Sequence, residues 1–505
     1  MKERSRRIDA DANRESDSGI VPEKPPNNEA PASAEEVEGR TLAKGNAEEK
    51  VTNQIQGWEM VSFGLDGVRK RAKTDKDCCF TSLLHHLDLD MLEASFAMLN
   101  HQAAAGIDGE TWKSYEERKQ ERLPKLKDEI HKGSYRAKPV LRKYIPKDES
   151  QKRPLGVTAV EDKLVQQATV NVLTAIYEEV FYGFSYGYRP GRSQHGALDA
   201  LAVGIQSRRI NWILDLDIQA FFDSIPHEPL LTMIKKKVGD KRILRLISKW
   251  LKTGYSEDGK IHRTTVGTPQ GSVISPLLAN IYLHYVLDEW VETERRSRPN
   301  GDVIMVRYAD DMVLGFQYKS EAERYLKAIG ERLAEFGLSL NLKKTRLIEF
   351  GRYAAERRQK RGEGKPESFD FLGFTHLCSV NKKGGYFLKR VTIGKRLRQS
   401  VKAITENLKK RMHRPVPETG KWLKMVVEGY GMYFGVPGNS KRLKRYRDLV
   451  VKEWFKSLRR RSQKGTALTW ARFNKIVDIY IPHLRICHDF PEVRFATTQG
   501  RSRMR

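Results

Sequence analysis

Two adjacent carboxylates, Asp310 and Asp311, interrupt an otherwise apolar stretch, VIMVRYADDMVLGF at residues 303–316. An apolar run, a short polar break and a second apolar run predict a strand, a tight turn and a strand. Two like charges within a few ångströms raise one another's pKa, so they are costly unless a cation lies between them. The stretch therefore predicts either a divalent metal site or an ordinary hairpin turn, because Asp is also a common turn residue.

A second pair of acids lies on an earlier apolar run, Trp212 to Asp217, which predicts a buried strand. Successive side chains of a strand point to opposite faces, so Asp215 and Asp217 share one face. The apolar side chains of the segment lie on the other face: Leu214, Leu216 and Ile218. We interpret Asp215 as structural and Asp217 as a candidate ligand.

The strand and the hairpin can bring Asp217, Asp310 and Asp311 together. Three carboxylates suit Mg²⁺, which prefers oxygen ligands and is bound by a few carboxylates plus substrate phosphates. Two such ions about 4 Å apart would stabilise the attacking and leaving oxygens of an in-line phosphoryl transfer. The acids thus predict a metal-dependent phosphoryl-transfer site.

The charge balance indicates a polyphosphate partner. The 505 residues include 92 Lys plus Arg and 64 Asp plus Glu, which gives a net charge of +28 and a pI near 9.8. Residues 1–50 carry a net charge of −3 and residues 391–505 carry +20, so the N-terminal leader is not the nucleic-acid-binding arm. Nucleic acid is therefore the expected partner of the folded part.

Cysteine usage and hydropathy indicate the cellular compartment in which the protein is expected. The 4 cysteines form no CxxC pair, so neither a disulfide framework nor a thiolate zinc site is predicted. The N-terminus has no apolar signal segment, and no run of roughly 18 apolar residues could span a bilayer. We therefore expect a cytoplasmic protein without a membrane partner.

Coarse patterns predict the elements around the acids. Asp223, Ser224 and Pro226 are start signals for one long polar helix, with Asp223 as its cap. The segment GTPQGS at 267–272 leads into an apolar helix. The remaining predictions are two helices around a loop over 83–130, a hairpin over 139–160 with a cationic tip at 147–152, helices over 161–206 and 318–336, a strand over 338–350, a Gly- and Arg-rich loop over 351–368, and mainly helices from 391 on.

Y-A-D-D in an apolar hairpin is preceded by LDLDIQAFFDSIPH at 214–227 and by GTPQGSVISPLLANIYL at 267–283. This combination resembles the palm of a reverse transcriptase, and in detail it is similar to bacterial group II intron reverse transcriptase/maturases. Further matching motifs extend the resemblance over about residues 80–505: Gly106-Ile107-Asp108-Gly109, Ile145-Pro146-Lys147, Arg153-Pro154-Leu155-Gly156, Ser185-Tyr186-Gly187-Tyr188-Arg189-Pro190, Asn341 with Lys344-Thr345, Phe371-Leu372-Gly373-Phe374, Gly429-Tyr430, Gly435 to Asn439, Arg459 to Gln463, and Trp470.

The resemblance implies an α+β fold, a right-hand polymerase with fingers, palm and thumb. A helical basic C-terminal maturase domain and a disordered N-terminal leader would complete the chain. The expected domains are a leader over 1–50, an N-terminal helical extension over 51–125, reverse transcriptase fingers and palm over 126–375, a thumb/maturase domain over 390–480, and a basic C-terminal tail over 481–505.

The resemblance also implies roles for the site residues. Asp217, Asp310 and Asp311 would hold two catalytic Mg²⁺ ions. Phe222 would close against the sugar 2′ carbon and admit dNTPs over rNTPs, unless it is simply a core aromatic. The other expected nucleotide-binding residues are Lys147 and Arg153 on the triphosphate, Gln270 near nucleotide and template, and Lys344 near the leaving pyrophosphate. A solvated turn, a helix entry and surface placement are the respective alternatives for these residues.

The basic C-terminal segments interleave cations with apolar residues, so one helix face can pack while the other lines a phosphate backbone. The same pattern is also typical of solvated helix faces. The resemblance favours binding of intron RNA, and the expected RNA-binding residues are Arg442, Lys444, Arg445, Arg459, Arg460 and Arg461. Expected partners are the host intron RNA, an RNA template with a DNA primer, dNTPs and target DNA.

The predicted function is an RNA-directed DNA polymerase that binds its host intron RNA and assists splicing and mobility. Ser272 and Tyr188 depart slightly from the family pattern, away from the acids. No Cys pairs typical of an appended H-N-H endonuclease occur, so we expect no second-strand cleavage and a primer supplied from elsewhere. The alternatives are a non-enzymatic splicing cofactor, a reverse transcriptase of another system such as a retron, a diversity-generating element or a CRISPR adaptation module, and a generic basic RNA-binding protein.

Overall fold

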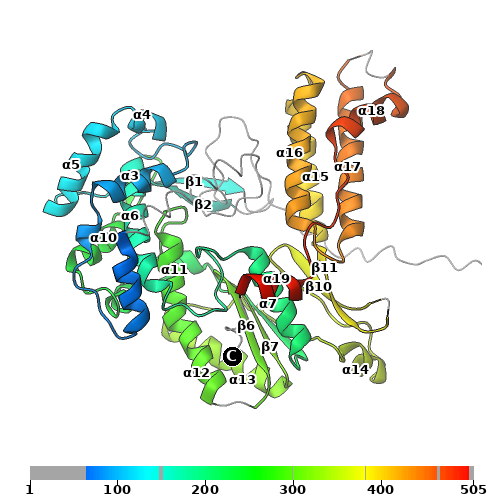
Figure 1. The fold of residues 1–505 in the computed structure, drawn as a ribbon, viewed down its shortest axis with the longest axis horizontal. Helices are drawn as coiled ribbons and strands as arrows, with labels where there is room; N and C mark the ends of the chain where they lie inside the picture. Colours follow the sequence, from blue (N-terminus) through cyan, green and yellow to red (C-terminus); the bar gives the residue numbers. More distant parts are fainter. Residues whose placement is uncertain (1–63, 147–151, 298–299, 382, 463–466, 500–505) are drawn as a thin grey trace, which may run out of the picture.

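The computed structural model describes residues 64–146, 152–297, 300–381, 383–462 and 467–499. This part of the chain mixes helices with three sheets, which confirms the predicted α+β class. Figure 1 shows a central sheet, a helical region with a hairpin on one side, and a group of long upright helices on the other. The predicted disordered leader, residues 1–50, lies outside the described residues.

The predicted hairpin is present as strands β1, Val140–Pro146, and β2, Lys152–Val157, which pair antiparallel. Strand β4, Tyr255–Glu257, extends this sheet by pairing parallel to β1, and β5, Lys260–His262, pairs with β4. Residues 147–151, which make up most of the predicted cationic tip, lie outside the described residues.

The N-terminal helices surround a loop, as predicted. A helix over 64–74 precedes a 3₁₀ turn at Leu84–His86 and helix α3, Leu89–Met98. The Asp88 side chain accepts a hydrogen bond from the backbone N–H of Met91 and so caps α3. After the loop, the predicted second helix is divided into α4, Trp112–Glu116, and α5, Lys119–Lys132.

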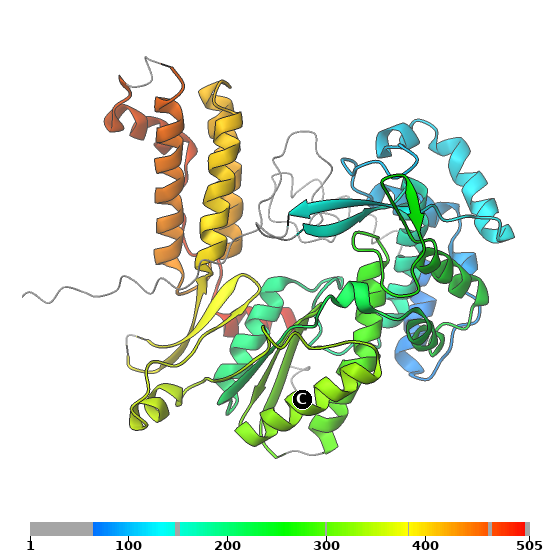
Figure 2. The same cartoon turned by 180° about the vertical axis from the view of Figure 1, so that it is seen from behind.

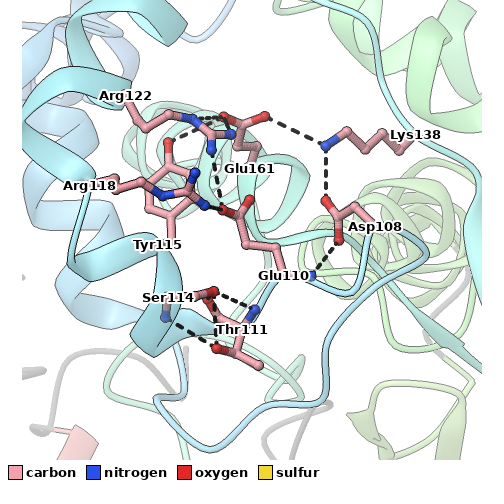
Figure 3. Close-up of polar contacts among 9 residues, drawn as sticks. All are labelled: Asp108, Glu110, Thr111, Ser114, Tyr115, Arg118, Arg122, Lys138 and Glu161. Atoms are coloured by element: carbon pink, nitrogen blue, oxygen red, sulfur yellow. Dashed lines mark hydrogen bonds and ion pairs between the residues drawn. The ribbon is translucent and has the colours of Figure 1, made fainter.

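Charged side chains tie this loop to the base of the hairpin (Figure 3). Lys138, just before β1, lies 2.9 Å from Asp108 of the loop and 3.9 Å from Glu161 at the start of helix α6, Val160–Tyr177. Arg122 of α5 pairs with Glu110 at 3.2 Å and with the same Glu161 at 2.5 Å. Glu161 thus joins α5 to the entry to β1, and its two cationic partners, Arg122 and Lys138, also bind the loop.

The central sheet has the strand order β6-β7-β3-β8, and its neighbours are antiparallel. The bounds are β6 Val303–Tyr308, β7 Asp311–Phe316, β3 Trp212–Leu216 and β8 Arg346–Glu349. The predicted strand–turn–strand and the predicted buried strand are both confirmed.

Helices cover both faces of this sheet. Leu214 and Leu216 of β3 join the core that includes helix α13, Lys319–Glu335, whereas Ile213 joins the core that includes helix α7, Gln194–Ser207. Because side chains alternate along a strand, Asp215 and Asp217 lie on the α7 face, opposite the leucines. This arrangement confirms the prediction that β3 has an acidic face and an apolar face.

Further helices complete the α13 side. They are α6, helix α11 at Ser275–Leu283, a π-helical turn at His284–Asp288, and helix α12 at Glu289–Ser297. The apolar helix after GTPQGS and the helices expected over 161–206 and 318–336 are therefore confirmed, with a connecting stretch between α6 and α7.

The prediction of one long helix after Asp223 was wrong. The chain forms α8, Phe221–Ser224, α9, His227–Lys235, and α10, Lys241–Lys252. Pro226 ends the first piece because the residue before a proline is disfavoured in the α conformation, and Ile225 has a ψ of 115°. Asp223 lies inside α8 and caps no later helix, since the N-cap of α9 is Pro226 without a side-chain hydrogen bond.

The predictions for 338–368 also need correction. Only Arg346–Glu349 forms a strand, because the backbone N–H groups of Lys344 and Thr345 donate to the carbonyl of Asn341 and close a turn. The predicted loop contains helix α14, Ala354–Lys360. Its Arg357 pairs with Glu349 at 2.8 Å, which fastens the helix to the end of β8.

The C-terminal part is mainly helical, as predicted. A three-stranded sheet of β9, Phe369–Phe371, β10, Phe374–Val380, and β11, Tyr386–Thr392, leads into it. The helices are α15 Gly394–Lys410, α16 Val416–Phe434, α17 Ser440–Arg459, α18 Trp470–Tyr480 and α19 Pro491–Gln499. Figures 1 and 2 show α15, α16 and α17 side by side and α19 returning to α7.

None of the helices in the described ranges combines the length and apolarity that crossing a membrane requires.

Candidate active site

The acidic hairpin closes with a two-residue turn. Tyr308 and Asp311 are the last paired residues of β6 and β7, which leaves Ala309 and Asp310 in the turn. Ala309 has a φ of 56°, in the left-handed region that two-residue hairpin turns use and that few non-glycine residues adopt. The two neighbouring carboxylates are thus held at one end of the central sheet.

Strand register brings Asp217 to the same end. The last pair between β3 and β7 is Leu216 opposite Met312, so the next step along both strands places Asp217 opposite Asp311. Residues opposite each other on paired strands share a face, so both carboxylates lie on the α7 face. The structure therefore places all three predicted acids at adjoining strand ends.

The carboxylate of Asp217 has two side-chain partners. Asn341 donates its Nδ2 hydrogen to Asp217 Oδ2 at 2.9 Å, and its backbone N–H donates to the Asp217 carbonyl at 2.8 Å. Lys344 Nζ donates to Oδ1 at 3.1 Å and to Oδ2 at 3.2 Å. The predicted pyrophosphate-side lysine thus lies on a predicted metal ligand.

A second cross-strand pair lies one step further along the sheet. Asp215 and Arg346 are opposite each other on β3 and β8, and their side chains are 3.2 Å apart. Burial raises the pKa of Asp215 to about 6, and the Arg346 guanidinium opposes that shift. The pairing supports the structural interpretation of Asp215.

The carboxylate set fits a hard divalent cation in its chemistry. Three acids at one end of a sheet offer the oxygen ligands that such ions prefer, and Asp217 already binds the ammonium of Lys344. Among the residues that the structure describes, no group of three or more His, Cys, Asp or Glu side chains is arranged to hold a metal. Because the Lys344 ammonium already contacts the Asp217 carboxylate, a metal ion bound at Asp217 would replace that ammonium.

The GTPQGS segment joins the chain after β3 to the hairpin sheet. The backbone N–H of Thr268 donates to the Phe222 carbonyl at 2.8 Å, and the N–H of Gly156 on β2 donates to the Gln270 carbonyl at 2.6 Å. Gln270 Nε2 donates to Asp223 Oδ2 at 3.2 Å. The structure thus brings three of the singled-out positions, Phe222, Asp223 and Gln270, together.

Glycine is required at this junction. Gly271 has a φ of +100°, and a Cβ there would lie 2.5 Å from the carbonyl oxygen of Gly156. Any side chain would push the segment away from β2 and strain the backbone. The Gly-rich sequence is therefore explained by close backbone approach.

Phe222 is 4% exposed and its ring lies edge-on to Phe221, with 5.4 Å between the centroids. Its side chain belongs to the core that includes α13. A role as a sugar gate stays a prediction beside the core alternative.

The expected triphosphate ligands are only partly described. Lys147 lies outside the described residues, and of Arg153 only the backbone, paired with Ile145 in the hairpin, is described. Their proposed roles stay predictions.

The expected RNA-binding cations lie on or just after α17. Lys444, Arg445, Arg459 and Arg460 are exposed and Arg442 is half-buried. Arg461 donates a hydrogen bond to the His413 carbonyl at 3.3 Å. Leu443, Tyr446, Val450 and Trp454 fill the opposite, buried side of the helix. The predicted division into a packed and a cationic face is therefore present.

Sequence reasoning missed four residues around the acidic turn. They are Arg307, Asp288 and Asn280, which lie behind Ala309 on the side opposite the carboxylates, and Gly187, which approaches the Ala309 backbone from a second side. The available signal was the charge of Arg307 inside an otherwise apolar run. Its partners come from distant segments, so no local pattern could have identified them.

A four-stranded antiparallel sheet, helices on both faces, and acids on a hairpin turn and the adjoining strand define the palm of a right-hand nucleic-acid polymerase. Comparison with known families agrees: residues 145–376 match the family described as reverse transcriptase (RNA-dependent DNA polymerase). That range includes strands β2, β4 and β5 of the hairpin sheet, the whole central sheet and all three acids.

Individual relatives show which reverse transcriptases and intron-encoded proteins the chain is similar to. The group II intron-encoded protein LtrA of Lactococcus lactis subsp. cremoris is 35% identical over 287 residues, which are 56% of this chain and 47% of LtrA. Protein YkfC of Escherichia coli (strain K12) is 32% identical over 290 residues, 51% of this chain and 76% of YkfC. An uncharacterized 91 kDa protein in the cob intron of Schizosaccharomyces pombe is 42% identical over 170 residues, 34% of this chain and 21% of that protein.

The chain belongs to the group II intron reverse transcriptase/maturase family. It spans about half the length of LtrA, since the matched region covers 47% of that protein.

Proposed function

We propose that this chain is an RNA-directed DNA polymerase that also binds its host group II intron RNA and assists splicing and mobility. The observation that carries the polymerase assignment is the convergence of Asp217, Asp310 and Asp311 at adjoining strand ends. A degenerate polymerase kept only for RNA binding would have no need for this set.

The cofactor would be Mg²⁺, as two ions held by Asp217, Asp310 and Asp311. When bound, such ions stabilise the attacking and leaving oxygens of an in-line phosphoryl transfer. The carboxylates would act as ligands and not as proton carriers.

The chain's own residues would bind and orient the substrates. Lys344 would leave Asp217 and place its charge near the leaving pyrophosphate, where a cation offsets developing negative charge. Gln270 and its glycine neighbours would hold nucleotide and template close to the backbone, and Lys147 and Arg153 would bind the triphosphate. Phe222 would exclude the ribose 2′-hydroxyl.

Primer extension on poly(rA)/oligo(dT) with Mg²⁺ tests the polymerase, comparing the wild type with Asp310→Ala. We expect extension by the wild type and none by the variant, with RNA binding retained by both. A folded, RNA-binding wild type without activity would instead favour the non-enzymatic splicing cofactor.

The observation that favours a second role is the cationic face of α17. Phosphate contacts make RNA binding salt-dependent, and each lost contact reduces the slope of log K against log salt by roughly one. Replacing Arg442, Lys444 and Arg445 together by Ala should lower intron RNA affinity and flatten this slope, while poly(rA)/oligo(dT) extension continues. An unchanged slope would remove α17 from the RNA-binding surface.

A further inference from the structure

Arg307 lies directly behind the acidic turn. It is paired with Met312 in the β6–β7 ladder, whereas Tyr308 is paired with Asp311, so its side chain is on the sheet face opposite the carboxylates. Its exposed fraction is 0%, which makes it one of the largest fully buried side chains of the described chain. A buried guanidinium is stable only when its charge and N–H groups are satisfied.

Asp288 supplies the counter-charge. Arg307 Nε donates to Asp288 Oδ1 at 2.8 Å, and Arg307 Nη2 donates to Oδ2 at 2.5 Å. Both side chains are 0% exposed, so the pair is a two-pronged ion pair without solvent screening. The forked geometry fixes the plane of the guanidinium.

The remaining nitrogen reaches the turn. Arg307 Nη1 donates to the carbonyl oxygen of Ala309 at 2.9 Å and to Asn280 Oδ1 at 3.0 Å. Asn280 in turn donates from Nδ2 to the Gly187 carbonyl at 2.7 Å. One fixed guanidinium thus holds the peptide that immediately precedes Asp310.

A π-helical turn places Asp288 for this contact. Residues His284–Asp288 form the turn between α11 and α12, and the N–H of Glu289 donates to the carbonyl of His284 five residues earlier. A π turn adds one residue to the helix and rotates the later residues relative to their positions in a regular α-helix. Asn280, on α11, and Asp288, after the extra residue, can therefore both face Arg307.

The turn is held from a second side by residues 184–187. The N–H of Tyr186 donates to the Arg307 carbonyl at 2.8 Å, and the N–H of Arg307 donates to the Phe184 carbonyl at 2.9 Å. A Cβ on Gly187 would lie 2.3 Å from the backbone nitrogen of Ala309. Backbone contact on one side and the guanidinium on the other leave the turn little freedom.

We propose that Arg307 is a positioning residue for the metal-binding carboxylates: it fixes the Ala309 carbonyl, and through it the direction of Asp310 and Asp311 relative to Asp217. The catalytic part of this role rests on the proposed polymerase function, whereas the contacts that fix the turn do not. Lys at this position would keep the charge yet could not bond Asp288, Asn280 and Ala309 with fixed geometry.

The experiment compares Arg307→Lys with the wild type by three measurements on the full chain. They are Mn²⁺ binding followed by electron paramagnetic resonance of the free ion, hydrogen–deuterium exchange of the peptide covering 303–316, and primer extension at increasing Mg²⁺. Removing groups that orient metal ligands typically weakens metal binding by roughly 10- to 100-fold. We expect a loss of that size in Mn²⁺ affinity, faster exchange confined to the turn, and a higher Mg²⁺ requirement.

Arg390→Lys is the matched control. Arg390 is 1% exposed and pairs with buried Asp199 at 2.9 Å, away from the turn. The Arg390→Lys variant should lose about as much stability as Arg307→Lys. Its Mn²⁺ affinity and the hydrogen–deuterium exchange of peptide 303–316 should equal those of the wild type. Equal changes in both variants, or no change in Arg307→Lys, would overturn the positioning role.

Asn280→Ala is the second variant, since it removes one Arg307 acceptor while keeping the ion pair with Asp288. If Arg307→Lys does not fold, faster turn exchange and weaker Mn²⁺ binding in Asn280→Ala support the proposal, and unchanged values overturn it. Absence of wild-type primer extension would count against the polymerase function alone, because metal binding and exchange report on the turn independently.

Discussion

The ammonium nitrogen of Lys344 lies 3.1 Å from Oδ1 of Asp217, on one of the three carboxylates that would bind metal. The two residues lie at adjoining ends of β8 and β3, one step beyond the Asp215 to Arg346 pair. The lysine therefore occupies the position of a cation at Asp217, and a metal ion bound there would compete with it.

Lys344→Met should tighten metal binding and slow catalysis. The lysine side chain is 58% exposed, and exposed ion pairs contribute up to about 1 kcal/mol, so Mn²⁺ affinity should rise by only a few fold. Primer extension should slow, since no cation would then move to the leaving pyrophosphate. Arg346→Met, in the neighbouring pair, should change Mn²⁺ affinity much less, and equal effects of both variants would refute the competition.

Phe222→Ala should raise ribonucleotide incorporation relative to the wild type, measured as the ratio of rNTP to dNTP insertion at one template position. Because Phe222 is 4% exposed, the truncation should also destabilise the fold by about 3 to 5 kcal/mol. Phe221→Ala is the control, since Phe221 is equally buried and lies beside it. If discrimination changes equally in both variants, the gate is misplaced.

His376 should make the fold sensitive to acid. It is 0% exposed and stacks on Phe369 at 4.7 Å, and burial, with a smaller contribution from the Arg390 charge, lowers the pKa of His376 to about 3. The unfolded chain binds this proton below about pH 6.5 and the folded chain does not, so stability falls as the pH falls below that value.

Between pH 7 and pH 5 this histidine should cost roughly 2 kcal/mol of unfolding free energy. Urea unfolding of the wild type and His376→Gln at both pH values measures the effect. The variant should be less stable at pH 7 but should lose roughly 2 kcal/mol less on acidification. Parallel pH profiles would contradict the assignment.

Asp199 should hold the C-terminal helix against the palm. Its carboxylate lies 2.9 Å from Arg390 of β11 and 3.0 Å from Arg494 of α19, and it is 2% exposed. Asp199→Asn would leave two cations without their counter-charge, which should cost about 3 to 5 kcal/mol. Thermal unfolding and limited proteolysis should show an earlier transition and a cleavable α19.

Val493→Thr is the control for this junction, because Val493 lies on the same helix but is 54% exposed. It should leave the transition and the cleavage pattern close to those of the wild type. A similar loss in both variants would show that Asp199 is not the anchor.

Much of the palm is predictable from local sequence alone. Apolar runs around Asp310 and Asp311 and the alternation of Asp215 and Asp217 with leucines predict β6, β7 and β3, and the structure confirms them. Local patterns suffice there because these strands are short apolar runs, buried between helices on both faces of the sheet. The predicted long helix after Asp223 failed because Pro226 and the contacts of the GTPQGS segment with 222–225 divide it.

The acids themselves and the type of the turn that carries them are properties of the sequence, since carboxylate chemistry and hairpin patterns are local. The surroundings of the turn were decided only by the tertiary structure. Arg307 contacts Asp288 and Asn280, and Asn280 contacts Gly187, because the sheet, a π turn and a distant loop converge there. The same is true of Lys344 on Asp217, which depends on strand order β7-β3-β8. Such contacts join residues that are separated along the chain, so no local pattern predicts them, and those around Arg307 are strengthened because burial removes competing water.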